Sequence, residues 1–279
     1  MKASVHQTGD SGSTPTPSLQ LMHADARKRF DADPSKCYQR HIRELYGASE
    51  SREQIRSLDG ARVERVTTEE AKSIILKYEW LQSMASGTSA CYGLKIGGEL
   101  IGVACFCCLG GKIRQLCIGA TVKETQALAE KTICLARGAC VPWAPKNAAS
   151  FLIRWACKQA HKDLGWKIFF AYSDHTAGEI GTVYQACGWH FLGDSFRKGK
   201  YHTDYVSADG RRVMSSYAKN HKGISRAQLI ADGWKPVARW NKKKYVWFEG
   251  TPTEREKLRS LCRYPFHPYP KREVGTVAK

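Results

Sequence analysis

Residues 169–193 carry the clearest structural signal in the chain and read FFAYSDHTAGEIGTVYQACGWHFLG. The apolar run that ends at Tyr172 predicts a buried strand, and the later TVYQACGW predicts the start of a helix. Gly178 and Gly181 bracket the polar turn between these two elements. A strand, a glycine-containing turn and a helix in this order favour an α/β fold, in which ligands gather beyond the carboxyl ends of the strands.

The same kind of pattern continues on the N-terminal side of this stretch. The glycine pair at 97–98 lies between two apolar runs, which predicts a β-hairpin. An apolar stripe that follows Thr68 predicts a helix with Thr68 as its N-cap. Residues 147–165 predict a further helix that stops at a glycine. We therefore expect an α/β domain with a mixed sheet over residues 61–205.

The segments on either side of this domain differ from it in composition. Residues 1–60 begin with a stretch rich in Ser, Thr, Gly and Pro, which predicts partial disorder, and continue with one or two surface helices. Residues 206–279 are basic and predict an extension packed on the main domain. The chain begins without the apolar core of a signal peptide, and no apolar run reaches the length of a membrane span, so the predicted location is the cytoplasm.

The chain is strongly basic. Lys and Arg number 44 against 26 Asp and Glu, which gives a formal net charge of +18 over 279 residues. A basic surface interleaved with aromatic residues favours a nucleic-acid partner, because charge supplies affinity and rings stack on bases. The alternative is a solvated charged face over a small aromatic cluster. The candidate nucleic-acid contacts are Arg239, Trp240, Lys242, Lys243 and Lys244.

The 11 cysteines are interpreted as reduced and mostly buried. Cys105 and Cys107 are expected on one face of a strand, and the spacing of the group lacks two C-x₂-C pairs. We therefore predict no zinc site among them.

Ionisable side chains cluster in sequence at two predicted strand ends. Asp174 and His175 follow the strand of the opening stretch, and Tyr184 lies on the next helix. Arg137 and Gly138 lie near the exit of the preceding strand. Convergence of these groups would form a catalytic pocket. In the alternative interpretation Asp174 caps the turn, Tyr184 packs in the core and Arg137 pairs with a carboxylate.

Five blocks of sequence carry a resemblance to a known family. The order of elements resembles the GNAT acyltransferase superfamily, with a mixed central sheet flanked by helices and here a basic C-terminal extension. More narrowly, the chain is similar to the phage Mom group of GNAT-like proteins over roughly residues 61 to 272. The blocks are YEWLQSM (78–84), GELIGVACF (98–106), LARGACVPWAPKNAASFLI (135–153), YSDHTAGEIGTVYQACGW (172–189) and YVWF with PYPKR near the end.

The resemblance implies a phage enzyme that converts adenine in double-stranded DNA to N6-carbamoylmethyl (acetamido-type) adenine. This modification protects the DNA from restriction in the cytoplasm of the infected bacterial host. The target base has to be flipped out of the duplex. By resemblance, Asp174 is the first candidate for the general base, with Glu79 and His175 as further candidates. Tyr184 is the expected general acid, and Glu79 stands where Mu-type members have a histidine.

The resemblance also implies acetyl-CoA, or another activated two-carbon donor, and leaves a metal ion open. GNAT enzymes hold the donor on a glycine-rich turn, but the equivalent stretch here, RGACVPWAPKNAAS, contains prolines, which have no N–H. The following helix start still offers amides to an anion. Arg137, Gly138, Asn147 and Ser150 are therefore the expected cofactor-binding residues.

Two other functions remain open at this stage. The first is a GNAT N-acetyltransferase of a small molecule or a protein, which would not require the net charge of +18. The second is a non-catalytic DNA-binding anti-restriction protein, which the altered donor loop would suit.

Overall fold

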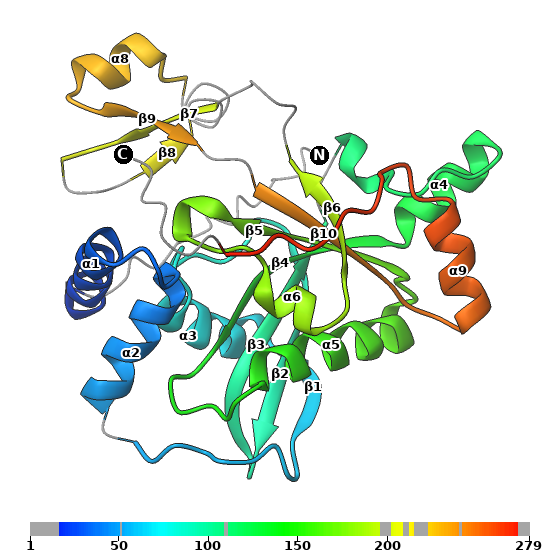
Figure 1. Ribbon diagram of the computed structural model, residues 1–279, viewed down its shortest axis with the longest axis horizontal. Helices are drawn as coiled ribbons and strands as arrows, with labels where there is room; N and C mark the ends of the chain where they lie inside the picture. Colours follow the sequence, from blue (N-terminus) through cyan, green and yellow to red (C-terminus); the bar gives the residue numbers. More distant parts are fainter. Residues whose placement is uncertain are drawn as a thin grey trace, which may run out of the picture.

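A seven-stranded sheet forms the centre of the protein in the computed structural model, which describes residues 17–50, 52–108, 111–195, 202–208, 212–214, 223–239 and 242–272. The strand order is β1-β2-β3-β4-β5-β10-β6 (Figure 1). The strands are β1 (Arg62–Val66), β2 (Thr88–Ile96), β3 (Glu99–Cys107), β4 (Thr132–Cys140), β5 (Ile168–Asp174), β6 (His190–Asp194) and β10 (Lys242–Phe248).

Strands β4 and β5 form the one parallel pair of this sheet, and all its other pairs are antiparallel. Their pairing covers Thr132–Leu135 against Ile168–Ala171 and then stops, although both strands continue. Beyond this point β4 stays with β3, and β5 stays with β10. The sheet therefore splits between β4 and β5 at their carboxyl ends.

Both faces of the sheet are covered, as β5 shows. Phe169 and Ala171 belong to one buried cluster, whereas Ile168 and Phe170 belong to the other. The alternation follows from the two-residue period of a strand. The first cluster includes residues of the helices α2, α3, α5 and α6, and the second includes residues of the 111–118 segment and of α9. The expected mixed sheet flanked by helices is confirmed.

The helices that pack around the main sheet are α3 (Thr68–Tyr78), α4 (Val122–Glu130), α5 (Ala148–Leu164), α6 (Thr182–Ala186) and α9 (Pro252–Ser260), with short 3₁₀ turns η1 (Gly111–Arg114) and η2 (His175–Ala177). Capping boxes begin α3, α4 and α9, whereas no side chain caps α5 or α6. Thr67, not Thr68, caps α3, because its side chain accepts from the Glu70 amide in a capping box. Gly165 ends α5 as expected, in the left-handed conformation. Sequence analysis did not predict α4 and α9.

The N-terminal segment contains two helices, α1 (Pro17–Ala32) and α2 (Tyr38–Glu50). Two helices are present as expected, and α2 buries one face while Arg40 and Glu44 stay exposed. Its residues Tyr38, Ile42 and Tyr46 are at most 4% exposed and belong to the same buried cluster as the sheet. We call α1 and α2 the N-terminal hairpin; it lies beside the main sheet in Figure 1.

The segment expected as a C-terminal extension, residues 206–279, is divided by the structure. Strand β10 enters the main sheet between β5 and β6. A separate three-stranded sheet is built from β7 (His202–Val206), β8 (Arg212–Met214) and β9 (Lys235–Arg239), with α8 (Arg226–Ala231) beside it (Figure 1). This small unit is therefore an insertion between β6 and β10, because those two strands pair directly in the main sheet.

Cys105 and Cys107 do not share a face of β3, in contrast to the expectation. Cys105 packs in the first buried cluster and Cys107 in the second. The register between β3 and β4 is irregular at this point, where Cys105 pairs with Arg137 and Phe106 with Leu135, so that Ala136 of β4 is the extra residue. All 11 cysteines are free thiols. Among the helices in the described part of the chain, none has the length and apolar character needed to cross a membrane.

Candidate active site at the split between β4 and β5

The split between β4 and β5 brings together most of the residues singled out in the sequence. Arg137 lies on β4 just beyond the last paired residue, and Asp174 ends β5. Glu79 immediately follows α3, and Tyr184 lies on α6. The charge of Arg137 acts on Glu79, and the charge of Glu79 helps to raise the pKa of Tyr184. Asp174 is connected to this group through Glu179, on which its charge acts. We call this group of side chains at the split the crevice.

The carboxylate of Asp174 is fully engaged within the protein. Its Oδ1 accepts from the amide of Thr176 at 3.0 Å and from the Thr176 hydroxyl at 2.5 Å, and its Oδ2 lies 3.1 Å from Nζ of Lys242. Burial alone would raise the pKa of Asp174, but Lys242 and Thr176 outweigh it and hold the pKa below its usual value. Asp174 therefore caps η2, as the alternative interpretation of the sequence expected, and pairs with Lys242; its role as general base stays a prediction.

Glu79 has the opposite environment. It is 5% exposed, and its Oε2 accepts a hydrogen bond from the Leu81 amide at 2.8 Å. Burial raises the pKa of Glu79 to about 8, despite the attraction of Arg137. Glu79 is therefore mostly protonated at neutral pH, with a pKa close to the value that suits proton transfer there.

Glu179 is a member of the site that sequence analysis missed. Its amide donates to the carbonyl of Asp174 at 3.1 Å, which holds it at the end of β5. Burial, and next the charge of Asp174, raises the pKa of Glu179 to about 7. The side chain is partly exposed, and its charge acts on both Glu79 and Tyr184. Nothing in the local sequence distinguishes this glutamate, because its burial depends on distant segments.

The phenol of Tyr184 lies beside these two carboxyl groups. Its ring contacts those of Trp189 and Tyr245, with a centroid separation of 5.2 Å in each pair. Burial, and next the charge of Glu179, raises the pKa of Tyr184 well above its usual value. The hydroxyl therefore keeps its proton at neutral pH and can act as a donor.

The turn that carries Glu179 is held by close packing. Gly178 and Gly181 both have left-handed backbones, with φ of +68° and +77°. A Cβ at Gly181 would lie 2.4 Å from the ring of Tyr245, whose hydroxyl donates to the Ile180 carbonyl at 2.5 Å. The two glycines are thus needed for the left-handed conformation and for the close approach of neighbouring rings.

Arg137 and Gly138 lie at the split, not beside the other expected cofactor residues. Nε of Arg137 donates to the Ser83 carbonyl at 2.7 Å, which ties β4 to the loop after Glu79. Gly138 is exposed. His175 is exposed on η2.

Asn147 and Ser150 line a separate groove of about 600 Å³. Asn147 is the N-cap of α5 in a left-handed conformation (φ 67°), and its side chain makes no capping hydrogen bond. The amide of Ala148 donates to the Pro145 carbonyl at 3.1 Å, and the other amides of the first turn receive no cap from the Asn147 side chain. Cationic and aromatic side chains from α5, β10 and α9 complete the groove: Arg154, Lys158 and Arg255 with Phe151, Trp155 and Trp247. Cationic groups, helix amides and rings are the chemistry that a phosphorylated, adenine-bearing donor requires.

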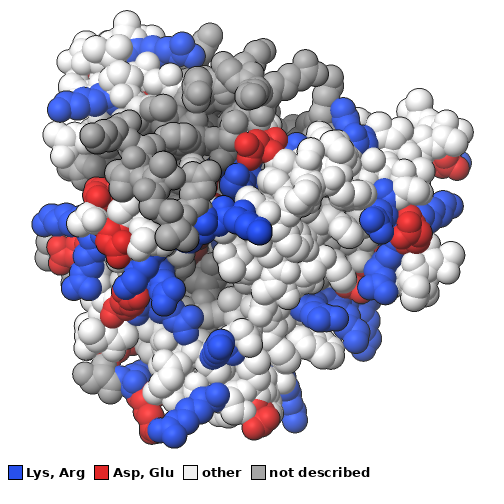
Figure 2. Space-filling model, in the orientation of Figure 1, with Lys and Arg blue, Asp and Glu red and all other residues white. Residues whose placement is uncertain are grey.

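The expected nucleic-acid residues on β10 are largely engaged in internal contacts. Lys242 pairs with Asp174, and Lys243 lies 3.4 Å from Asp194. Lys244 is 9% exposed and lies 4.0 Å from the ring centroid of Tyr264, so its proposed DNA contact is corrected. Trp240 and the side chain of Arg239 lie outside the described residues. Figure 2 shows that Lys and Arg are instead spread over the visible face, with fewer Asp and Glu among them.

Metal-ligating side chains do not gather in the described residues: no group of three or more His, Cys, Asp or Glu there could hold a metal ion.

The model of the Mom protein family matches residues 60–271, which contain β1 to β10 and the whole crevice. The chain belongs to the Mom protein family. The expected family is thus confirmed. No curated protein matches the chain.

Solved structures that resemble the chain are acetyltransferases of low sequence identity. A Bacillus subtilis acetyltransferase in complex with CoA is 14% identical, with 68% of this chain and 99% of that chain covered and a TM-score of 0.38. A GNAT family acetyltransferase from Elizabethkingia anophelis with acetyl-CoA bound is 10% identical, covering 68% and 99%, with a TM-score of 0.36. The polyamine N-acetyltransferase of Drosophila melanogaster is 10% identical, covering 68% and 100%, with a TM-score of 0.37.

Proposed function

We propose that this member of the Mom family is a transferase that attaches a carbamoylmethyl (acetamido-type) group to N6 of adenine in DNA, and so protects that DNA from restriction. The observation that carries the proposal is the crevice where Glu79 and Glu179, with pKa values of about 8 and about 7, meet the protonated phenol of Tyr184. Such a set can both take a proton from an amine and give one to a leaving group.

The amine of adenine is a weak nucleophile, because its lone pair is delocalised into the ring. A carboxylate within hydrogen-bond reach of N6 compensates by accepting its proton as the new N6–carbon bond forms. Glu179 is the better placed of the two for this role, since it is partly exposed and its lower pKa leaves more of it ionised at neutral pH. As the bond between carbon and leaving group breaks, Tyr184 donates its proton to the leaving atom. Solvent then returns the proton from the carboxyl group to the phenolate.

The groove beside Asn147 and Ser150 is proposed to hold an acyl-CoA or related donor, which supplies an activated two-carbon unit. Arg154, Lys158 and Arg255 would bind its phosphates. Simple acetyl transfer to N6 would give an N6-acetyl product. A carbamoylmethyl product instead requires N6 to bond to a methylene carbon, so the mass of the product identifies the kind of donor.

The substrate is proposed to be double-stranded DNA with the target adenine flipped into the crevice, in the cytoplasm of a bacterial host. The net charge of +18 supports a polyanionic substrate. The DNA contacts are expected on the dispersed basic surface and not on Lys244, which is buried.

The test is mass spectrometry of nucleosides from plasmid DNA of bacteria that express the protein. We expect a new deoxyadenosine derivative with the mass of a carbamoylmethyl adduct, and its loss in the Tyr184→Phe and Glu179→Gln variants at equal levels of folded protein. Glu69→Gln is the matched control, because Glu69 is an exposed glutamate on α3 (82% side-chain exposure). Unmodified adenine in DNA from cells with abundant folded wild-type protein would overturn the proposal, and an N6-acetyl adduct would replace it by simple acetyl transfer.

A further inference from the structure

The N-terminal hairpin contacts the chain on both sides of Glu79. The side-chain amide of Gln39 on α2 donates to the carbonyl of Tyr78 and accepts from the amide of Trp80 at 3.0 Å. Tyr78 ends α3, so its carbonyl is one of those that a helix terminus leaves without an internal partner. The Gln39 side chain thus forms hydrogen bonds with both peptide groups that flank Glu79.

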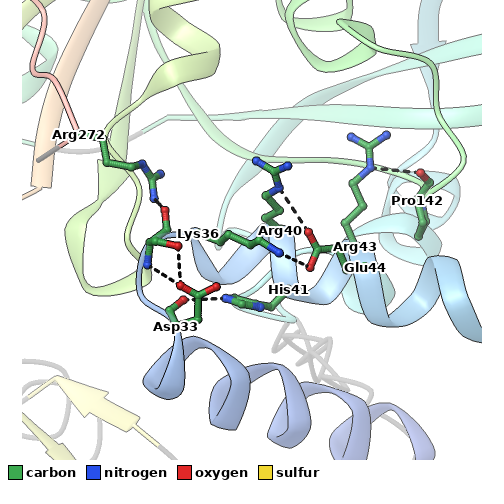
Figure 3. Close-up of polar contacts among 9 residues, drawn as sticks. Asp33, Lys36, Arg40, His41, Arg43, Glu44, Pro142 and Arg272 are labelled. Carbon is green, nitrogen blue, oxygen red and sulfur yellow. Dashed lines mark hydrogen bonds and ion pairs between the residues drawn. The ribbon is translucent and has the colours of Figure 1, made fainter. Parts of the chain in front are cut away.

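The same helix holds the loop that leads into the donor groove. Arg43 donates to the carbonyls of Pro142 at 3.2 Å and Ala144 at 2.7 Å (Figure 3). After α2, Gln54 donates to the carbonyls of Trp143 and Ala144, and Ile55 donates its amide to Trp143. Three successive carbonyls just before Asn147 therefore have donors from the N-terminal segment.

The hairpin also supports the turn that carries Glu179. Phe30 and Cys37 lie against Gly178 so closely that a Cβ there would come within 2.8 Å and 3.2 Å of them. Arg272, from the C-terminal segment, donates to the carbonyl of Ser35 at 2.5 Å and to that of Gly178 at 3.2 Å. The turn between α1 and α2 and the turn after η2 are thus joined through one guanidinium group.

All three loops that carry the proposed site therefore rest on a segment outside the matched region, which begins at residue 60. We propose that the N-terminal hairpin is a working part of the active site, and that Gln39 is the positioning residue that holds the carboxyl group of Glu79 in the crevice. This inference rests on the proposed function for its activity readout. Its structural readout is independent of any reaction.

The first test is a ¹³C NMR titration of the Glu79 carboxyl group in the full-length chain, with the signal assigned through Glu79→Gln. In Gln39→Ala the loop loses both anchors, water reaches the carboxyl group, and its titration midpoint is expected to move from about 8 toward the ordinary 4.5. Arg40→Ala is the matched control, because the neighbouring Arg40 is two-thirds exposed and its ion pair is with Glu44 on the same helix (Figure 3). Other groups also act on this titration and are unchanged in both variants: Arg137, Glu179, Lys242, Tyr184 and Cys105.

The second test is the rate of adenine modification as a function of pH. Gln39→Ala is expected to lower the rate about 10- to 100-fold at neutral pH, because Glu79 sets the electrostatic environment of Glu179 and Tyr184 and a shift of roughly an ångström in an active site has an effect of this size. The limb of the profile that belongs to Glu79 should shift to lower pH. In a Glu79→Gln background, Gln39→Ala should have little further effect, because both changes act through one group.

The outcomes separate the two proposals. If the wild-type protein leaves adenine unmodified while the Glu79 midpoint still moves in Gln39→Ala, the proposed reaction fails and the positioning role stands. If Glu79 titrates at the same pH in Gln39→Ala, Arg40→Ala and the wild type, the positioning role is overturned whatever the activity. A loss of activity of equal size in the Glu79→Gln background would also overturn it.

Discussion

Replacement of Glu79 by glutamine should stabilise the protein while it impairs the reaction. An unfolded glutamate ionises above pH 4.5, whereas Glu79 in the folded protein ionises only above about 8. Between these values the unfolded state has released a proton that the folded state still holds, so rising pH favours unfolding. The destabilisation is absent below pH 4.5 and reaches its full size above pH 8.

The magnitude follows from the size of the pKa shift. Each pH unit between the two pKa values corresponds to about 1.4 kcal/mol, so Glu79 lowers the free energy of unfolding by about 3 kcal/mol at pH 7 and about 5 kcal/mol above pH 8. A glutamine at this position has no charge to desolvate, and its oxygen can still accept from the Leu81 amide. Glu79→Gln should therefore recover most of that amount, which is already net of the attraction to Arg137.

The assay is urea denaturation of wild type, Glu79→Gln and the exposed control Glu69→Gln from pH 4 to pH 9, with nucleoside analysis of the DNA from the expressing cells. The difference in free energy of unfolding between wild type and Glu79→Gln should rise with pH and then level off above about pH 8. A difference that is independent of pH, or a glutamine variant that is less stable at pH 7, would refute the reasoning, because it would mean that Glu79 is ionised and stably paired with Arg137.

Three further predictions follow from contacts in the crevice and the groove. Gly181→Ala should lower stability by about 1–3 kcal/mol, since its Cβ would overlap the Tyr245 ring and φ is +77°, and thermal denaturation measures this. Lys242→Met should cost about 1–3 kcal/mol at neutral pH, and less as pH falls and Asp174 is protonated, because it leaves that mostly buried carboxylate unpaired; urea denaturation at several pH values checks it. Arg154→Ala should weaken CoA binding about 10-fold in calorimetry; unchanged affinity would place the donor elsewhere.

Many strands, helices and turns of the main domain could be predicted from local sequence patterns. The hairpin turn at Gly97 and Gly98, the stop of α5 at Gly165 and the buried strand before Asp174 each depend on short-range rules of periodicity and backbone conformation. The helices α4 and α9 also had a local signal, because each begins with a capping box, at Thr121 and Thr251. The spacing of Thr121 and Glu124, and of Thr251 and Glu254, is therefore enough to predict where both helices begin.

The roles of the individual side chains in the crevice could not be predicted from local sequence patterns. Asp174 was placed correctly at a strand end, but its partner Lys242 lies on a strand 68 residues later that inserts between β5 and β6. That pairing lowers the pKa of Asp174, in addition to the cap that Asp174 makes to Thr176. The sequence around Glu179 does not indicate a functional residue, because the burial and the raised pKa of Glu179 come from groups that only the fold brings near it.

The amino-acid sequence by itself determined most strands and helices of the main domain, the family to which the chain belongs and the excess of positive charge, because each of these depends on residue order or composition alone. The tertiary structure decided which carboxyl groups are poised for proton transfer and which are neutralised, and it placed the N-terminal hairpin against the three loops of the site. The physical reason is that a pKa depends on burial and on neighbouring charges, and both are set by contacts between residues far apart in the chain.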